Sequence, residues 1–517
     1  MVTRRELLAG AGAVVVAGGA GLKPLPAKAA QHKTVVLASM GPVTGNWDPT
    51  SHTTLGQLKF EKFVFNHLTR CEMREGKSEE LIPDLATSWK LIDTHTLEFK
   101  LRDGVKFHDG KEFGAEDVKA TMEYASNPAR PASALYPGRV DVEVVDNLTV
   151  RLKTEKHGYP AFAFWFISSF LPILSAKDIA DPALLQKRPN GTNAFKYAGT
   201  QGDRNSLEAN DEFYGGRPKI DRIIYAYVPD ANTRVLGLLN GEYHIAERLE
   251  PEQYASLSSN PKVTTHKALT TENKYLHFRC NKPPFNDARL RRAVCHAIDR
   301  DQILSLMGEA ATPSNCYISP TKFGFTDIPD YPKFDPGACQ KLLAEAGFPK
   351  GKGLPQLEYI TSIGFYPKTK EYGELITAML AEQGLDVRLT VLEPAAWEQA
   401  IYRRADGQGQ GHMCDVGWMT GSPEPDLVLR PNWQSSAALI TGINDREIDA
   451  VLDKERAATN PEERRRIFKN ETFPTLANKV PSFSLFSAVT FHGAAKNLTG
   501  AYYFPNGPID LSKADLS

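Results

Sequence analysis

The run from Leu81 to Tyr124 constrains the fold more than any other stretch, because each short piece of it predicts one local structure. From Thr96 to Arg102, apolar and polar side chains alternate, which is the period-2 pattern of a half-buried strand. Asp103-Gly104 is a turn dipeptide, and Gly114 stands where a helix N-cap is expected. The buried stripe of that helix is expected to comprise Val118, Met122 and Ala125. The run therefore predicts a hairpin, a loop and then a helix.

The same run resembles family 5 of the solute-binding proteins of bacterial ABC importers, the peptide, nickel and opine group. The matching motifs are PDLATSW at Pro83 to Trp89 and LEFKLRDGVKFHDGKEFGAEDV at Leu97 to Val118. Two later stretches, Asn281 to Arg300 and Tyr331 to Gly347, resemble the same family. The alternative is the surface hairpin and helix of an unrelated α/β protein, which so many matches in order disfavour.

The resemblance covers nearly the whole chain after its leader and implies an α/β fold. The implied architecture is a two-lobed periplasmic binding protein (type II, cluster C-like) with an extra subdomain inserted in the first lobe. By that analogy, lobe I holds residues 30–75, 191–278 and 490–517, the inserted subdomain holds 76–190, and lobe II holds 279–489. The two lobes are expected to close about a two-strand hinge near Tyr275–Cys280 and Ser484–Val489.

The N-terminus has the pattern of a twin-arginine export signal over residues 1–29. Arg4-Arg5 precedes an apolar run that ends at Leu22, and Ala27-Lys28-Ala29 is a cleavage site. A permanent membrane anchor is disfavoured because the run is short, glycine-rich and followed by that site. The first cysteine is Cys71, so no lipidated cysteine follows the leader, and we expect a periplasmic protein.

Composition excludes several classes of protein. The formal net charge is -1, so no basic field favours nucleic acid or an anionic membrane surface. The six cysteines are too dispersed for a disulfide scaffold, although one or two bridges are permitted in an oxidising compartment. Their pairing cannot be assigned from the sequence.

The sequence does not match the common motifs of catalytic or cofactor-binding sites. The segment from Gly104 to Lys111 has one residue too many between its glycines for a P-loop, and Glu112 replaces the Ser or Thr that binds magnesium. No G-x-S-x-G or H-E-x-x-H is present, and the histidines lack metal-ligand spacing. We therefore predict no catalytic residue, no metal site and no cofactor.

Candidate ligand-binding residues come from four stretches. Loops at strand ends line clefts in α/β proteins, which makes the loop after the strand Lys33–Met40 a candidate, with ordinary turn chemistry as the alternative. Trp397 is a candidate stacking platform, with core packing as the alternative. The residues proposed from these positions are Asn46, Trp47, Asp48, Glu272, Asn273, Trp397, Trp418, Met419, Thr420 and Gly421.

The segment Asp415–Trp433 resembles the family's W-x-x-D motif at the cleft. In peptide-binding relatives the acid of that motif pairs with the peptide's amino group, but here the acid position holds Gly421. This departure weakens a simple peptide interpretation. Asp415, Glu424 or Asp426 are the acids that stand near enough in sequence to replace it.

Three further expectations concern packing. The apolar run Ala161–Leu174 is expected to be a core helix or a cleft wall, and Tyr275–Phe278 a short strand. Arg289, Arg291 and Arg292 lie largely outside the buried stripe of the helix that Asp287 caps, and are expected to form a solvated face.

The function predicted from these features is that of the periplasmic substrate-binding component of an ABC importer. It would capture a small organic ligand, such as a peptide, an opine or a related peptide-like or sugar-like compound, and deliver it to a membrane permease. We expect a monomer that binds no nucleic acid and performs no covalent chemistry. The alternatives are a twin-arginine-exported periplasmic enzyme that binds a cofactor or metal, and a ligand sensor or chaperone without a transport role.

Overall fold

Two long neighbouring strands, β12 (Val263–Phe278) and β17 (Ser482–Ala495), form the centre of the structure. The computed structural model describes residues 32–51, 55–71, 81–130, 140–154, 171–402, 409–458 and 460–517. Within them, an 11-stranded sheet has the order β15-β14-β16-β12-β17-β11-β1-β10-β9-β8, with β13 (Ala311–Thr312) paired to β17 beside this path. The predicted leader, residues 1–29, lies outside the described residues.

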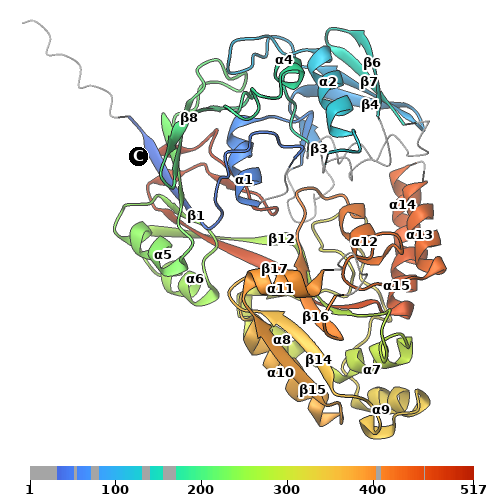
Figure 1. The fold of residues 1–517 in the computed structure, drawn as a ribbon. Helices are drawn as coiled ribbons and strands as arrows, with labels where there is room; N and C mark the ends of the chain where they lie inside the picture. Colours follow the sequence, from blue (N-terminus) through green and yellow to red (C-terminus); the bar gives the residue numbers. More distant parts are fainter. Residues whose placement is uncertain are drawn as a thin grey trace, which may run out of the picture. The chain divides into compact units, whose positions relative to one another are not determined.

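The strands on one side of β17 form what we call lobe I, and those on the other side of β12 form lobe II (Figure 1). Lobe I contains β1 (Thr34–Ser39), β8 (Phe195–Gln201), β9 (Arg204–Ala209), β10 (Arg222–Tyr227) and β11 (Ile245–Ala246). Lobe II contains β14 (Leu357–Ser362), β15 (Val387–Leu392) and β16 (Met413–Trp418). In both lobes the strands beside the centre include parallel pairs, as crossover helices require.

Strand β12 is much longer than the predicted strand Tyr275–Phe278, so that prediction was wrong in extent. Its first half pairs with β17 alone, and from Asn273 onward it is paired on both sides, with β17 and with β16. The register shifts between Leu269 and Asn273, where the strand passes from one lobe to the other. The sequence does not show the alternation of a half-buried strand here, because both faces of β12 are buried around Glu272 and Lys274 and polar residues occur on both.

A separate four-stranded sheet confirms the predicted hairpin and helix. Its order is β4 (Ala86–Asp93), β5 (Thr96–Leu101), β7 (Thr149–Lys153) and β6 (Asp141–Asp146), and it packs against α2 (Ala115–Ala125). The expected stripe residues Val118, Met122 and Ala125 are all buried in a hydrophobic cluster of their own. The remaining described strands form two-stranded sheets. These are β2 (Thr69–Cys71) with β3 (Leu81–Pro83), β18 (Leu498–Thr499) with β21 (Asp515–Leu516), and β19 (Tyr502–Tyr503) with β20 (Ile509–Asp510).

The helices surround these sheets. In lobe I and the four-stranded part they are α1 (Leu55–Val64), α4 (Ala176–Ala180), α5 (Ala231–Leu239) and α6 (Pro251–Ser258). In lobe II they are α7 (Ala288–Ala297), α8 (Arg300–Met307), α9 (Pro336–Glu345), α10 (Thr369–Glu382), α11 (Pro394–Ile401), α12 (Asp426–Trp433), α13 (Arg446–Arg456), α14 (Pro461–Ile467), the π-helical turn η6 (Phe468–Thr472) and α15 (Phe473–Lys479). None of the helices in the described ranges has both the length and the apolar character needed to span a bilayer.

The predicted solvated face of α7 is wrong for Arg291. Asp287 caps this helix as expected, accepting a hydrogen bond from the Arg289 amide. Arg291, however, is buried, and its guanidinium donates to the backbone carbonyls of Phe285, Lys479 and Val480. A guanidinium that satisfies the carbonyls at the end of a helix is stabilised by that helix's dipole, and here the helix is α15.

The structure also describes part of the apolar run Ala161–Leu174 and all six cysteines. Residues 161–170 of the apolar run Ala161–Leu174 lie outside the described residues, while Leu171, Ile173 and Leu174 are buried. All six cysteines are buried and unbridged, so none of the permitted disulfides forms.

Candidate functional site

The parallel strands of lobe I bring three loops together at one edge of the sheet. Strand β1 is parallel to both β10 and β11, so the carboxyl ends of all three strands point the same way. The residues that follow these ends, Met40, Pro229 and Arg248, all line one cavity. This is the position at which open α/β sheets bind their ligands.

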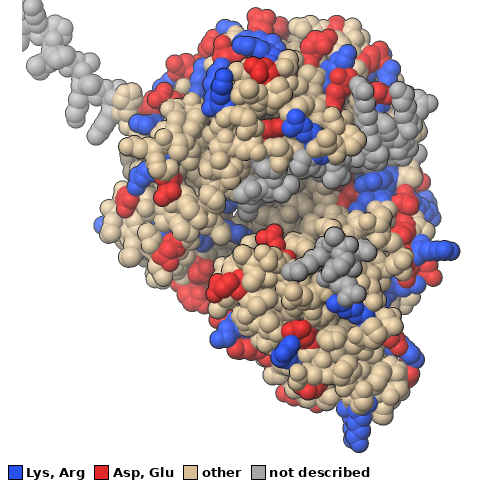
Figure 2. Space-filling model, viewed as in Figure 1, with Lys and Arg blue, Asp and Glu red and all other residues tan. Residues whose placement is uncertain are grey.

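Lobe II presents an equivalent edge to the same cavity. Strand β14 is parallel to β15 and β16, and the segment that follows it, residues 363–372, lines the cavity from Ile363 to the first turn of α10. The space between is about 400 Å³ and is completed by Thr270, Glu272 and Lys274 of β12 and by Phe486 to Phe491 of β17. Figure 2 shows one face of the molecule, which is hollowed between the two lobes. The cavity is therefore assembled from both lobes and from the strands that connect them.

One wall of the cavity is aromatic. Phe365, Tyr366, Tyr372 and Phe486 line it, and Phe365 is exposed although it is large and apolar. Trp397 lies behind this wall, with its ring centroid 5.3 Å from that of Phe365 and 5.9 Å from that of Tyr366. The predicted platform Trp397 is thus a buried support for the two rings that line the cavity.

Two cationic side chains of the cavity lining, Arg234 and Lys274, already interact with groups of the protein. All the hydrogen bonds of the Arg234 guanidinium go to backbone carbonyls, including those of Val228 and Glu247. The Lys274 ammonium lies 3.1 Å from Asp415 Oδ2 and 3.1 Å from the centroid of the Tyr366 ring. Burial lowers the pKa of Lys274, and the Asp415 carboxylate acts in the opposite direction.

Arg248 and Glu272 differ from these groups. The Arg248 guanidinium has Met40 Sδ, at 3.5 Å, as its hydrogen-bond contact, and its backbone has a φ of 47°, in the left-handed region. Glu272 is 5% exposed, and burial raises its pKa while Arg248 and Lys274 act to lower it. Strained backbone and buried charges cluster at binding sites more often than elsewhere.

The predicted loop residues Asn46, Trp47 and Asp48 do not line the cavity. The Trp47 ring is buried against Phe60 and Tyr197, with centroid distances of 5.6 and 4.8 Å. Asp48 accepts hydrogen bonds from Tyr124 and from the Arg130 guanidinium, and Asn46 donates to Ser51. These contacts organise the loop itself.

Asn273 is fully buried between the two lobes' strands. Its amide donates to Ser314 Oγ, the Cys316 carbonyl and Ser484 Oγ, and its carbonyl oxygen accepts from Ser487 Oγ. All of its hydrogen-bonding capacity is used within the protein, so it stabilises the strand crossing next to Glu272.

The segment after β16 faces a second, smaller cavity. Met419, Thr420 and Gly421 line a space of about 160 Å³ together with Leu58, Lys59 and Asn506 of lobe I. Trp418 itself is half-buried, and its indole N–H donates to the Leu427 carbonyl at 2.8 Å. Trp418 therefore braces the segment that carries the three following candidates.

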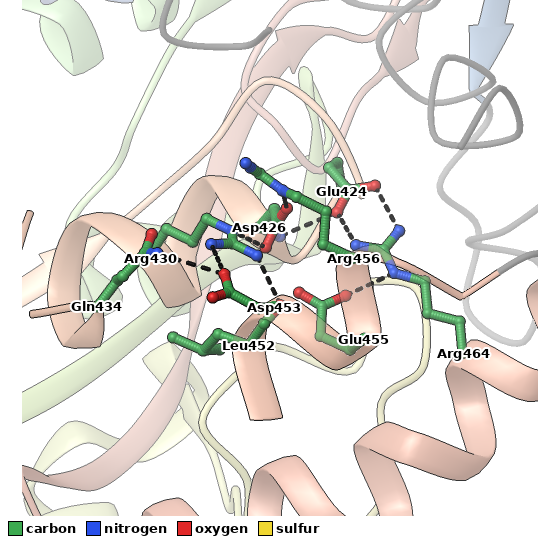
Figure 3. A network of polar contacts seen from close by, with 9 residues as sticks. All are labelled: Glu424, Asp426, Arg430, Gln434, Leu452, Asp453, Glu455, Arg456 and Arg464. Atoms are coloured by element: carbon green, nitrogen blue, oxygen red, sulfur yellow. Dashed lines mark hydrogen bonds and ion pairs between the residues drawn. The ribbon is translucent and has the colours of Figure 1, made fainter. Parts of the chain in front are cut away.

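None of the acids near Gly421 is available to replace its missing carboxylate. Asp415 accepts from Tyr359 and Tyr372 in addition to its contact with Lys274. Glu424 forms a two-pronged ion pair with Arg464, and Asp426 contacts Arg430 and Arg456 (Figure 3). Burial acts to raise the pKa of Asp426, but Arg456 and Arg430 together hold it well below its usual range.

The sequence did not identify Arg248, Lys274, Phe365 and Tyr366. Arg248 follows strand β11, and Phe365 and Tyr366 follow β14, so the strand-end rule that singled out Asn46 also applied to them. Lys274 had no such signal, because its burial depends on partner strands that are distant in sequence. Within the described ranges, no group of three or more His, Cys, Asp or Glu side chains is arranged to hold a metal ion.

Comparisons with known proteins agree on one family. The model of bacterial extracellular solute-binding proteins, family 5 middle, matches residues 80–439. The heme-binding protein A of Haemophilus influenzae is 29% identical over 86% of this chain and 85% of its own length. The dipeptide-binding protein of Escherichia coli is 27% identical over 93% of this chain and 94% of its own. The solved structure of the ABC transporter substrate-binding protein CtaP from Listeria monocytogenes superimposes with a TM-score of 0.81 at 24% identity, covering 94% and 99% of the two chains.

Proposed function

The chain belongs to family 5 of the bacterial extracellular solute-binding proteins, and from this premise we propose which ligand it captures and where. Its fold is the two-lobed α/β fold of these proteins, and its function is that of the substrate-binding component of an ABC importer. We propose that the ligand is a small organic solute of the peptide-like or opine-like class, held in the cavity of about 400 Å³.

One observation carries this proposal. The carboxyl ends of parallel strands from both lobes meet at one cavity, so a ligand there contacts lobe I, lobe II and the connecting strands together. Contacts that exist only when the lobes are close together favour the closed form, and a ligand that makes them shifts the equilibrium toward it. The aromatic wall and the charges at Arg248, Glu272 and Lys274 suit a solute with both apolar and ionic parts.

The other predicted ligand residues take different places in this proposal. Met419, Thr420 and Gly421 would contact ligands that extend into the smaller cavity. Asn46, Trp47, Asp48, Asn273, Trp397 and Trp418 would act as supports. The similarity to a dipeptide-binding protein supports a peptide-like ligand, and the glycine at position 421 requires that the cationic end of such a ligand be held elsewhere.

We keep the predicted division into lobe I (30–75, 191–278, 490–517), inserted subdomain (76–190) and lobe II (279–489) as part of the proposal. The separate four-stranded sheet with its own hydrophobic cluster supports the inserted subdomain. We propose the hinge at Thr270–Asn273, a few residues before the predicted Tyr275–Cys280, and the register shift of β12 between Leu269 and Asn273 supports this position. In β17 the crossing at Ser487–Val489 lies within the predicted range.

We also propose that residues 1–29 direct twin-arginine export and that the protein acts in the periplasm as a monomer, without catalysis or nucleic-acid binding. On the face shown in Figure 2, charged side chains of both signs are interspersed, and the formal net charge is -1, which supports the absence of nucleic-acid binding. Replacing both Arg4 and Arg5 with lysine should leave the protein in the cytoplasm, and continued export of this variant would contradict the twin-arginine assignment.

Native mass spectrometry of the purified protein tests the capture function directly. We expect a co-purified small solute, which should stabilise the protein by roughly 2.7 kcal/mol when added back at about 100 times its dissociation constant. Ala488→Trp fills the cavity from β17 and should abolish this stabilisation, whereas Ile92→Trp, at an exposed position of β4, should not. A solute that stabilises the Ala488→Trp variant fully would place the site elsewhere.

The same preparation separates the alternative classes. A visible absorption band or a stoichiometric metal would favour the cofactor or metal enzyme, and binding without any interaction with a permease would favour a sensor or chaperone. A colourless protein that carries an organic solute and couples to a permease supports the importer.

A further inference from the structure

Glu272 is a buried acid of the cavity lining. Among the described residues no side chain or backbone group forms a hydrogen bond or ion pair with its carboxylate, although its backbone amide donates to Thr270 Oγ1 at 3.1 Å. The side chain is 5% exposed and lines the cavity. A buried carboxylate without a partner costs free energy, so a ligand that supplies the partner recovers that cost on binding.

The Glu272 carboxylate packs against Gly417 of strand β16. A Cβ atom at Gly417 would lie 1.9 Å from Glu272 Oε1 and 3.0 Å from Tyr366 Cε1. The carboxylate thus rests against the bare backbone of β16 and beside the Tyr366 ring, whose hydroxyl donates to the Gly417 carbonyl at 3.0 Å. A side chain at 417 would displace the carboxylate from this position.

The other acids of the cavity lining do not share this environment. Asp230 is the N-cap of α5 and accepts hydrogen bonds from Thr233. Glu250 and Glu371 are exposed to solvent. Glu272 is therefore the one lining acid, among the described residues, that is buried and unengaged.

Arg248 is its cationic counterpart in lobe I. Its guanidinium forms no ion pair with any described carboxylate, in contrast to Lys274, which is held by Asp415, and to Arg234, which is held by backbone carbonyls. A guanidinium presents planar paired donors that match a carboxylate. Among the described residues, the cavity thus offers one acid without a hydrogen bond or ion pair on β12, Glu272, and one guanidinium without an ion pair on lobe I, Arg248.

We propose that Glu272 binds a primary ammonium group of the ligand and that Arg248 binds its carboxylate, so that this chain selects zwitterionic solutes. The inference rests on the proposed function and deepens it, because it assigns the cationic end of the ligand to strand β12. It also accounts for Gly421: the segment after Trp418 needs no acid when the hinge strand carries one.

The test uses the full-length exported protein, freed of bound solute, and three forms each of the dipeptides Ala-Ala, Leu-Ala and Gly-Phe. The forms are the free dipeptide, the N-acetylated dipeptide and the C-terminal amide. Calorimetry should show that N-acetylation weakens binding to the wild-type protein at least about tenfold, because it leaves Glu272 buried and unpaired. Amidation should weaken binding through the loss of the contact with Arg248.

The variants assign each effect to a residue. Glu272→Gln, which has nearly the same shape, should bind free and N-acetylated dipeptides equally, and Arg248→Gln should lose the difference between acid and amide. Glu371→Gln removes an exposed acid from the same cavity and should keep the wild-type ratios. Circular dichroism and the melting temperature establish that each variant is folded.

Two outcomes overturn the assignment while leaving the capture function intact. One is an N-acetylated dipeptide that binds the wild-type protein as tightly as the free one. The other is a co-purified solute, identified by mass spectrometry, that has no cationic group. A protein that neither carries a solute nor binds any form of the panel overturns the proposed function itself.

Discussion

A buried carboxylate that lacks a partner lowers the stability of the protein that contains it, and Glu272 should make this cost measurable. Burial raises its pKa in the folded state, against the opposing influence of Arg248 and Lys274. Below the ordinary pKa of glutamate, both the folded and the unfolded chain are protonated at this site and no cost arises. As the pH rises from the ordinary to the raised value, the unfolded chain ionises first, so the wild-type protein loses stability.

Glu272→Gln removes this ionisation, and we expect it to melt at a higher temperature than the wild-type protein in the absence of ligand. The difference should be close to zero at acidic pH and should grow as the pH rises to about 8, because only the wild-type folded state must then accommodate the charge. Differential scanning fluorimetry across this range measures it. The exposed control Glu371→Gln should follow the wild-type curve, and a Glu272→Gln variant that is less stable at pH 8 would contradict the assignment. A gain in stability joined to a loss of binding is characteristic of a functional residue.

For single residues, the sequence predicts contacts with near neighbours in the chain better than it predicts which side chains are buried. Asp287 was identified as an N-cap because the capping acceptor and its amide lie within three residues of each other, and it makes that bond. Arg291 was misplaced because its partners, the carbonyls of Lys479 and Val480, are almost 190 residues away. Glu272 was proposed as a ligand residue, but nothing in the neighbouring sequence indicated that its carboxylate would pack against Gly417.

At the scale of helices, a buried charge network joins three elements of lobe II. Arg464 of α14 pairs with Glu424, just before α12, and with Glu455 of α13 at 2.7 Å (Figure 3). Its guanidinium also lies over the rings of Phe323 and Phe468. This network fixes the end of the segment that begins at Trp418, and so supports the smaller cavity.

Arg464→Met should destabilise the protein by about 3–5 kcal/mol, because it leaves the carboxylates of Glu424 and Glu455 buried without their cation. Equilibrium unfolding in urea measures the change in free energy. Arg466→Met, which removes an exposed arginine from the same helix, should change stability by less than about 0.5 kcal/mol. If the two variants unfold at the same urea concentration, the network contributes no stability.

The sequence predicts elements well where one face is solvated and poorly where both faces are buried. The hairpin that contains strand β5 and the helix α2 were expected from alternation, turn dipeptides and a single buried stripe. Strand β12 was recognised only at its end, because the polar residues from Thr270 to Lys274 are all buried and show no period. The same segment contains the proposed hinge and Glu272, which is why the candidate site was harder to predict than the fold.

At the scale of the whole molecule, polar contacts between described residues of the two lobes border both cavities. Lys368, which precedes α10, forms an ion pair of 2.7 Å with Glu252 of α6, and its backbone φ of 53° is left-handed. Asn506 donates to the Gly421 carbonyl at 2.7 Å. The first contact borders the larger cavity and the second borders the smaller one. Because each contact requires the lobes to be close together, we infer that both stabilise the closed form.

Removing both contacts with Glu252→Gln and Asn506→Ala should therefore weaken binding of the co-purified solute without changing the melting temperature of the ligand-free protein. The ion pair of Lys368 with Glu252 is worth at most about 1 kcal/mol and the partly buried hydrogen bond of Asn506 about the same, which corresponds to an affinity about 5- to 30-fold lower for the pair. The wild-type affinity should fall more steeply than that of the double variant between about 50 and 500 mM NaCl, since salt screens the ion pair that only the wild-type protein forms. Calorimetry at the two salt concentrations measures both effects. Glu345→Gln breaks an exposed pair with Lys341 within α9 and should change neither affinity nor its salt dependence. Equal affinities for the wild-type protein and the double variant would mean that closure depends on the ligand and the hinge alone.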